Sequence, residues 1–173
     1  MGAVVTLDEA KAWLGEATAY ADPQISAIVE GAVAAVERAI GSSIAATEVA
    51  DEYHDGDGRL VLYLGRMPAI SVSTVTIDGT QVNDCVLEES FRLYRAACFP
   101  YGRRNVVVTY MAGYNPVPDD LKLAVLMLVK FYAGSQLTAR SMWFEGGGGV
   151  GQEHEWPNQV KMIVGTYRMP SVV

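Results

Sequence analysis

Histidines and carboxylates are the residues of this chain whose types could bind a metal ion or catalyse hydrolysis. The 173 residues contain two histidines, His54 and His154. His154 stands between Glu153 and Glu155, which resembles half of a metal site, but neighbouring residues of a strand or helix point in different directions and cannot all ligate one ion. We therefore interpret His154 as a solvated loop residue and His54 as a surface or strand-edge residue. A metal-dependent hydrolase that uses His54 and His154 remains an alternative function.

Carboxylates also cluster in the stretch DEYHDGDG, residues 51–58. Its second half resembles the start of a calcium-binding loop, but Arg59 occupies the next ligand position and the closing glutamate is missing. The pattern therefore predicts a turn. The chain has no Gly-x-Ser-x-Gly motif and no cysteine with a plausible neighbouring base. We predict no catalytic site, no metal site and no cofactor, and hence no enzyme.

Residues 144–152, FEGGGGVGQ, contain five glycines. A phosphate-binding loop needs glycines at set offsets between a strand and a helix, whereas these are mostly consecutive, contain no lysine and are flanked by glutamates. Ordering such a backbone costs about 1–2 kcal/mol per residue, with glycine at the upper end. We predict that residues 141–155 are mobile in the free protein and become anchored through Trp143 and Phe144 when a partner binds.

Four arginines surround a run of aromatic residues in the middle of the chain. Aromatic and basic side chains together can bind single-stranded nucleic acid, so a small nucleic-acid-binding module is a second alternative function. A solvated or subunit-facing edge is the favoured interpretation. The residues are Arg92, Arg95, Arg103 and Arg104, with Phe91, Tyr94, Phe99 and Tyr101.

The composition is that of a globular protein, with 50% hydrophobic and 19% charged residues and a formal net charge of -7. Such a chain has no broad basic face for nucleic acid, because phosphate binding needs clustered lysines and arginines. The longest apolar run, residues 123–129, is far too short to cross a membrane. The N-terminal residues do not resemble a secretory signal, so we expect a soluble protein made without export. Cys85 and Cys98 are interpreted as small buried thiols, with a disulfide as the alternative.

Local signals place four helices around a region of strands. Thr6 and Glu9 form a capping box before the first helix, and Asp22 with Pro23 opens a second that ends at Gly41. A third helix begins near Pro118, and a fourth lies between prolines 157 and 170. Between the second and third helices the apolar period changes to two, and Asp78-Gly79 predicts a hairpin turn. The strands are predicted at residues 60–64, 70–77, 81–87 and 105–113.

This order predicts an α+β fold, mainly helical, with a small antiparallel sheet inserted between helices 2 and 3. No repeat or linker is visible, so residues 1–173 are predicted to form one domain. The third helix is apolar almost all round, with Lys122 and Lys130 as the clearly polar residues of its body. Either it passes through the centre of the fold or part of it contacts another subunit.

The whole-chain pattern resembles the head–tail connector proteins of tailed bacteriophages, also called adaptor or head-completion proteins. The opening TLDEAKAWL is followed by the helix of residues 27–41 and by LYLGRMPAISVSTVTIDG, residues 62–79. A later strand then runs through Gly-Tyr and two prolines into the hydrophobic helix, residues 106–133. The chain closes with VKMIVGTYRMP, residues 160–170. The resemblance covers nearly all of the chain.

This resemblance implies a structural virion protein that forms a ring of about twelve copies beneath the portal. Its expected partners are itself, the portal protein and tail-completion or tail proteins. DNA would pass through the ring without specific binding, and no membrane and no enzymatic step are expected. The expected location is the head–tail interface of the virion, with the host cytoplasm during assembly.

Seven residues are predicted to contact a neighbouring subunit or the portal. They lie on the third helix, before the glycine run and at the end of the last helix. They are Leu126, Val129, Lys130, Trp143, Phe144, Tyr167 and Arg168.

Overall fold

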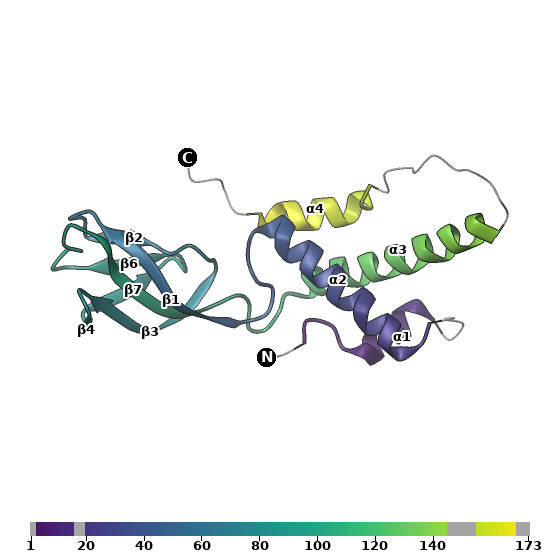
Figure 1. The fold of residues 1–173 in the computed structure, drawn as a ribbon, viewed down its shortest axis with the longest axis horizontal. Coiled ribbons are helices and arrows are strands. Elements are labelled where there is room, and N and C mark those ends of the chain that lie inside the picture. The colour runs from purple at the N-terminus through teal and green to yellow at the C-terminus, as the bar shows by residue number, and fades with distance from the viewer. Residues whose placement is uncertain (1–2, 16–19, 145–154, 169–173) are drawn as a thin grey trace. The chain divides into compact units, whose positions relative to one another are not determined.

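The computed structural model describes residues 3–15, 20–144 and 155–168, and of residues 135–144 it describes the backbone only. The described chain divides into two compact units (Figure 1). We call residues 41–116 the sheet unit, and residues 3–40 together with those from 117 onward the helical unit. The predicted α+β class is confirmed, because the strands all lie between the second and third helices. The assignment of residues 1–173 to one domain stays a prediction.

Local signals in the sequence place the ends of the helices. The helix α1, Leu7–Leu14, has the predicted capping box: the hydroxyl of Thr6 accepts from the Glu9 amide, and the Glu9 carboxylate accepts from the Thr6 amide. The other three helices of the described residues are α2, Asp22–Ile40; α3, Asp119–Phe144; and α4, Asn158–Tyr167. Pro157 occupies the N-cap position of α4, without a capping hydrogen bond from its side chain, and Gly41 follows α2 with a positive φ of 81°. All four helices predicted from the sequence are therefore confirmed.

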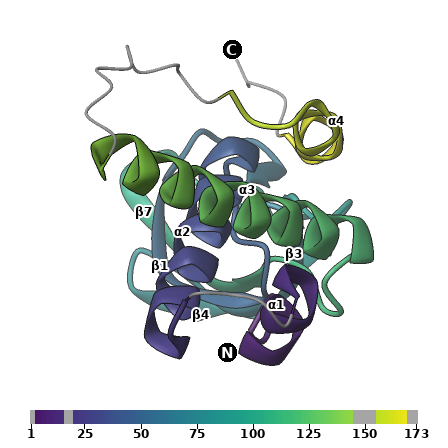
Figure 2. The same cartoon turned by 90° about the vertical axis from the view of Figure 1, so that its right-hand side faces the viewer.

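The core of the helical unit surrounds α3, which packs against each of the other three helices (Figure 2). Among its residues 119–134, whose side chains are described, five are fully buried: Leu121, Ala124, Val125, Leu128 and Val129. The helices α2 and α4, which pack against α3, also bury apolar side chains, such as Ile25 and Val160. The apolar character of α3 is thus explained at these positions by its place in the centre of the helical unit.

The sheet unit contains seven strands in two antiparallel sheets. The larger sheet has the order β1-β7-β3-β4 and the smaller one the order β2-β6-β5. The strands of the larger sheet are β1, Thr47–Gly56; β7, Gly102–Ala112; β3, Ala69–Ile77; and β4, Thr80–Val82. Those of the smaller sheet are β2, Val61–Tyr63; β6, Arg92–Arg95; and β5, Cys85–Glu88.

The strand predictions were partly correct. The runs at 60–64, 70–77 and 105–113 correspond to β2, β3 and β7. The run at 81–87, however, is two strands in different sheets, β4 and β5, and β1 extends to Gly56 into the stretch predicted as a turn. The hairpin at Asp78-Gly79 is confirmed, with φ values of 50° and 78°.

One hydrophobic cluster fills the space between the two sheets. Its fully buried members include Leu93 of β6, Val106, Val108 and Tyr110 of β7, and Phe99 from the connection between these strands. Because both sheets contribute to the same cluster, their remaining faces point away from each other. The sheet unit is therefore a small sandwich with two outer faces.

Candidate functional site

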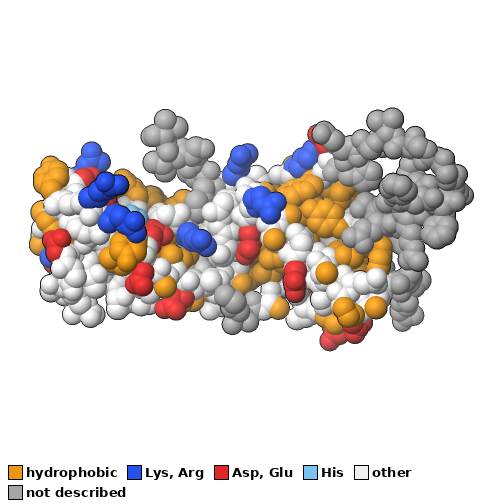
Figure 3. All heavy atoms as spheres, viewed as in Figure 1, with side chains coloured by type: hydrophobic (Ala, Val, Ile, Leu, Met, Phe, Trp, Pro, Cys, Tyr) orange, Lys and Arg blue, Asp and Glu red, His pale blue; other side chains and the backbone are white. Residues whose placement is uncertain are grey.

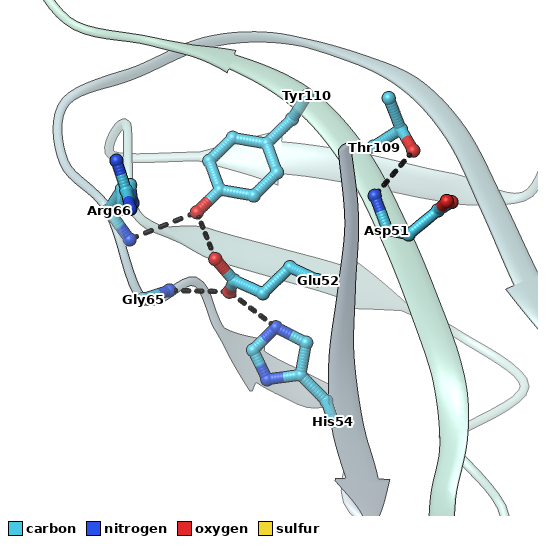
Figure 4. Close-up of polar contacts among 7 residues, drawn as sticks. All are labelled: Asp51, Glu52, His54, Gly65, Arg66, Thr109 and Tyr110. Atoms are coloured by element: carbon cyan, nitrogen blue, oxygen red, sulfur yellow. Dashed lines mark hydrogen bonds and ion pairs between the residues drawn. The ribbon is translucent and has the colours of Figure 1, made fainter. Parts of the chain in front are cut away.

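The most connected polar group of the sheet unit is the carboxylate of Glu52 on β1 (Figure 4). Its Oε1 accepts a hydrogen bond from the amide of Gly65, at 2.8 Å, and lies 2.6 Å from Nε2 of His54. Its Oε2 accepts from the hydroxyl of Tyr110, at 2.7 Å, and that hydroxyl accepts in turn from the amide of Arg66. The network ties β1 and β7 to the segment that leads from β2 to β3.

The network holds Glu52 ionised. Burial raises the pKa of this carboxyl, but the hydrogen bonds from His54, Gly65 and Tyr110 outweigh burial and lower the pKa to about 2. Burial and the bond to Glu52 both raise the pKa of Tyr110, so its phenol stays protonated. Both carboxylate oxygens already accept hydrogen bonds, which leaves little capacity to take a proton from a substrate. The network therefore has a structural role. We call the carboxylate of Glu52 with its partners His54, Gly65 and Tyr110 the Glu52 clamp.

His54 lies beside Glu52 and not at an open edge. Its side chain is 18% exposed, and its Nε2 faces the carboxylate. Among the described residues, no group of three or more His, Cys, Asp or Glu side chains is placed to hold a metal ion. His154 lies outside those residues. The imidazole of His54 thus has the Glu52 carboxylate as its partner. This geometry gives no support to a role of His54 in a metal centre.

The four arginines of the predicted basic patch have different surroundings. Arg92 pairs with Glu88 at 3.0 Å, and Arg95 pairs with Asp84 at 2.8 Å. The guanidinium of Arg104 lies 4.4 Å from the ring centre of Tyr53 on β1. On the face shown in Figure 3, basic side chains lie among acidic and hydrophobic ones and form no continuous basic surface. Cys85 and Cys98 are free thiols, as predicted, but both are half-buried and not buried.

The seven residues predicted to contact a neighbour have different degrees of exposure. Leu126 is partly exposed and Lys130 is exposed, whereas Val129 is fully buried among the helices. A neighbour on this side of α3 would therefore reach Leu126 and Lys130 before Val129. The side chains of Trp143 and Phe144 lie outside the described residues.

The last two of the seven lie at the C-terminal end of α4. The hydroxyl of Tyr167 donates to the carboxylate of Asp120, at 2.7 and 2.8 Å, which joins the end of α4 to the first turn of α3. Arg168 follows α4 and is exposed. The interface role of all seven residues stays a prediction.

The predicted mobile segment, residues 141–155, overlaps the end of α3, which runs to Phe144. Residues 145–154 lie outside the described ones, so this prediction also stays a prediction. In the part of the chain that is described, no helix is long and apolar enough to span a membrane.

Sequence reasoning missed the Glu52 clamp and the outer faces of the sandwich. A weak signal for the clamp was present, because Glu52 and His54 are two positions apart on a strand and so share one face. The third partner, Tyr110, lies 58 residues from Glu52 in the sequence. Nothing in the sequence near Glu52 indicates that contact.

Comparisons with known proteins give a matching family model and solved structures with a similar fold. The model of a family described as "head completion protein" matches residues 3–170. No curated protein gives a significant match. Among solved structures, a chain from the neck of an empty GTA particle, computed with C6 symmetry, has a TM-score of 0.65 and 19% identity. The match covers 98% of this chain and 92% of that chain.

Two further solved structures have similar folds. A chain from the virion of a native gene transfer agent (GTA) particle has a TM-score of 0.63 and 16% identity, covering 98% of this chain and 92% of that chain. A chain from the neck of a native GTA particle, computed with C12 symmetry, has a TM-score of 0.56 and 18% identity. That match covers 87% of this chain and 84% of the other. At these identities the likeness concerns the fold.

Proposed function

The chain belongs to the head completion protein family, and from this premise we propose that it is a ring-forming head–tail connector that docks beneath the portal and extends the DNA channel toward the tail. Members of that family are structural, non-enzymatic virion proteins. The observation that carries the proposal is the extent of the family match, which spans residues 3–170.

The ring is supported by the solved structures with the same fold. Two of them come from particle necks computed with cyclic symmetry, C6 and C12. A ring of about twelve copies of this chain, in contact with the portal on one side and with tail-completion or tail proteins on the other, fits such an arrangement. A closed ring needs two different surfaces on each copy, so that every copy contacts both neighbours.

The passage of DNA is supported by charge. The chain has a formal net charge of -7, and an acidic channel wall repels the phosphate backbone, so that DNA slides without adhering. The two alternative functions have less support. His54 is engaged with Glu52, and two of the four arginines of the basic patch are neutralised by carboxylates.

The test of the proposed function is assembly. The purified chain is expected to form closed oligomers at high concentration, or when it is mixed with the portal protein of the same phage. Electron microscopy of both samples would show rings on their own or rings attached to portals. Persistent monomers that do not bind a portal would contradict the proposal.

We also expect negligible affinity for duplex DNA near physiological salt. The dissociation constant should be weaker than the roughly 10⁻⁴–10⁻⁶ M of non-specific DNA-binding proteins, because the chain is acidic. Fluorescence anisotropy of a labelled duplex, titrated with the chain at two salt concentrations, measures this. Micromolar binding that weakens steeply with salt would contradict the prediction, and its loss in Arg103→Ala and Arg104→Ala would locate the contact.

A further inference from the structure

The outer side of the smaller sheet is apolar. The pairing of its strands places Val61 of β2 beside Tyr94 of β6, and Tyr94 beside Val86 of β5. Tyr63 stacks on Phe91 with ring centres 6.1 Å apart. Val86 and Tyr63 are 58% and 56% exposed, so large apolar side chains face solvent here. We call this surface the apolar face; it comprises Val61, Tyr63, Val86, Phe91 and Tyr94.

The apolar face carries a compensated charge. Arg92 lies on the outer side of β6, opposite Tyr63 on one strand and Glu88 on the other. Its guanidinium pairs with Glu88 at 3.0 Å and with Glu89 at 3.3 Å. The face therefore offers no unpaired cation to nucleic acid, and it suits a partner surface that is itself uncharged.

On the outer side of the larger sheet, β3 and β7 carry uncharged residues. Charged residues lie along β1, where Glu48 pairs with Met111 and the Asp51 amide donates to the Thr109 hydroxyl. On β3 and β7 the outward residues alternate with buried ones, and they pair across the strands as Thr76 with Val107, Thr74 with Thr109, and Ser71 with Met111. Within the described sheet unit, no strand or helix covers them. We call this surface the threonine face; it comprises Ser71, Thr74, Thr76, Val107, Thr109 and Met111.

The two faces point in opposite directions, because the inward residues of both sheets belong to one core cluster. A surface on each side of a unit is the arrangement that a cyclic ring requires, since each copy presents one surface to the copy before it and another to the copy after it. Resting on the proposed function, we propose that the apolar face of one copy packs against the threonine face of the next copy, and that this contact closes the ring.

The negative charge of the chain limits the surfaces through which two copies can make contact. Each copy has a net charge of -7, so identical copies repel one another through most of their surface. Contact between them is favourable where charge is absent or compensated. The apolar face meets that condition, and the threonine face meets it away from its β1 edge, where Glu48 and Asp51 lie. The centres of protein interfaces are also depleted of charged residues and enriched in tyrosine, phenylalanine and methionine, which are the residues that these faces supply.

Placing one cation on either face should prevent the contact. Val86→Arg and Thr74→Arg change exposed positions of the apolar face and of the threonine face. Each should raise the concentration for half-assembly about 30-fold or more, because an unpaired charge is buried in the interface. Ala97→Arg is the matched control, because it adds the same charge at an exposed turn that follows β6 and lies on neither face. Sedimentation velocity and electron microscopy measure assembly, and circular dichroism confirms that each variant is folded.

A double variant distinguishes this contact from a contact between two apolar faces. In Val86→Arg/Thr74→Glu, each interface of the proposed ring brings an arginine against a glutamate, so rings should return. In a contact between two apolar faces the arginines would meet each other, and the double variant would remain unassembled. That result would overturn the proposal.

The remaining outcomes separate the proposal from the proposed function. If the wild-type chain forms rings, and the folded variants Val86→Arg and Thr74→Arg form the same rings, the proposed faces are refuted and the connector function is left intact. Wild-type chain that forms no ring, alone or with the portal, would refute the connector function and this interface with it.

Discussion

Replacing Glu52 by glutamine is expected to lower the free energy of unfolding by about 3 kcal/mol at pH 7. The carboxyl has an ordinary pKa of 4.5 and a pKa of about 2 in the folded chain, and each pH unit of difference corresponds to about 1.4 kcal/mol. The amide that replaces it has one acceptor oxygen for three donors. Its NH₂ group would face the Gly65 amide or the Tyr110 hydroxyl, which both donate to Glu52, and a buried donor would lose its partner.

The pH dependence of stability provides a second measurement of the same clamp. Because the folded state lowers the pKa of Glu52, the ionised form stabilises the fold. This contribution is complete above about pH 4.5, and it is lost as the pH falls through about 2. The stability of the wild-type chain should therefore fall toward that of Glu52→Gln across this range. The two curves should converge near pH 2.

Urea unfolding followed by far-ultraviolet circular dichroism, repeated between pH 2 and pH 7, gives both curves. Glu48→Gln is the matched control, because Glu48 lies on the same strand and is exposed. Its stability should remain within about 0.5 kcal/mol of wild type. Equal stability of Glu52→Gln and Glu48→Gln at pH 7 would show that the carboxylate does not clamp β1 to the Gly65 segment in solution.

Local chemistry made the helices and one hairpin predictable. Thr6 and Glu9 satisfy free amides at the start of α1, and Pro23 and Pro157 have no amide hydrogen to satisfy at the starts of α2 and α4. These residues therefore identify helix ends without knowledge of the tertiary structure. Asp78 and Gly79 adopt the positive φ that a two-residue hairpin needs. These signals act within a few residues, which is why the sequence alone predicted them.

The strand β1 and the arrangement of two sheets were not predictable in the same way. Alternation along β1 is interrupted by a register shift between Val49 and Glu52, where Asp51 has a positive φ of 51°. Two of its inward residues, Glu52 and His54, are polar, so no apolar period of two appears. Their burial depends on Tyr110, which the chain brings near only in the folded state.

The short strands of the smaller sheet gave an equally weak signal. β6 has four residues, and two of them are arginines whose charges are compensated by Glu88 and Asp84. The outer faces of the sandwich follow from which strands pair with which, and pairing between distant strands has no local signature. The candidate interface on those faces therefore required the structure.

The substitution Gly56→Ala is expected to destabilise the chain by about 3 kcal/mol or more, through overpacking of a tightly packed site. Gly56 ends β1 and is buried. Its amide donates to Oδ1 of Asn105 at 2.8 Å, and the side chain of Asn105 donates to the carbonyl of Pro100 at 3.0 Å. A Cβ atom at Gly56 would collide with the oxygen of that carbonyl and lie 2.9 Å from its carbon.

The obstruction is backbone, so it cannot be relieved by rotating a side chain. Moving Pro100 away would disturb Phe99, which is 1% exposed in the core of the sandwich. The carbonyl of Phe99 accepts a hydrogen bond from the Gly58 amide, and its amide donates to the carbonyl of Arg59. The end of β1, the connection before β7 and the core between the sheets would therefore have to shift together. The loss of stability in Gly56→Ala should therefore lie at the upper end of the range that is typical of overpacking.

Alanine substitutions at two other glycines distinguish the effect of a steric collision from the effect of the backbone conformation. Gly79→Ala meets no atom within 4 Å but must keep a φ of 78°, so it should cost about 1 kcal/mol. Gly31→Ala, inside α2, also meets no atom within 4 Å, and it should stabilise the chain by about 0.5–1 kcal/mol because alanine favours a helix. Urea unfolding of the three variants should rank Gly31→Ala first, Gly79→Ala second and Gly56→Ala last. If Gly56→Ala were no less stable than Gly79→Ala, β1 would not approach Pro100 this closely in solution.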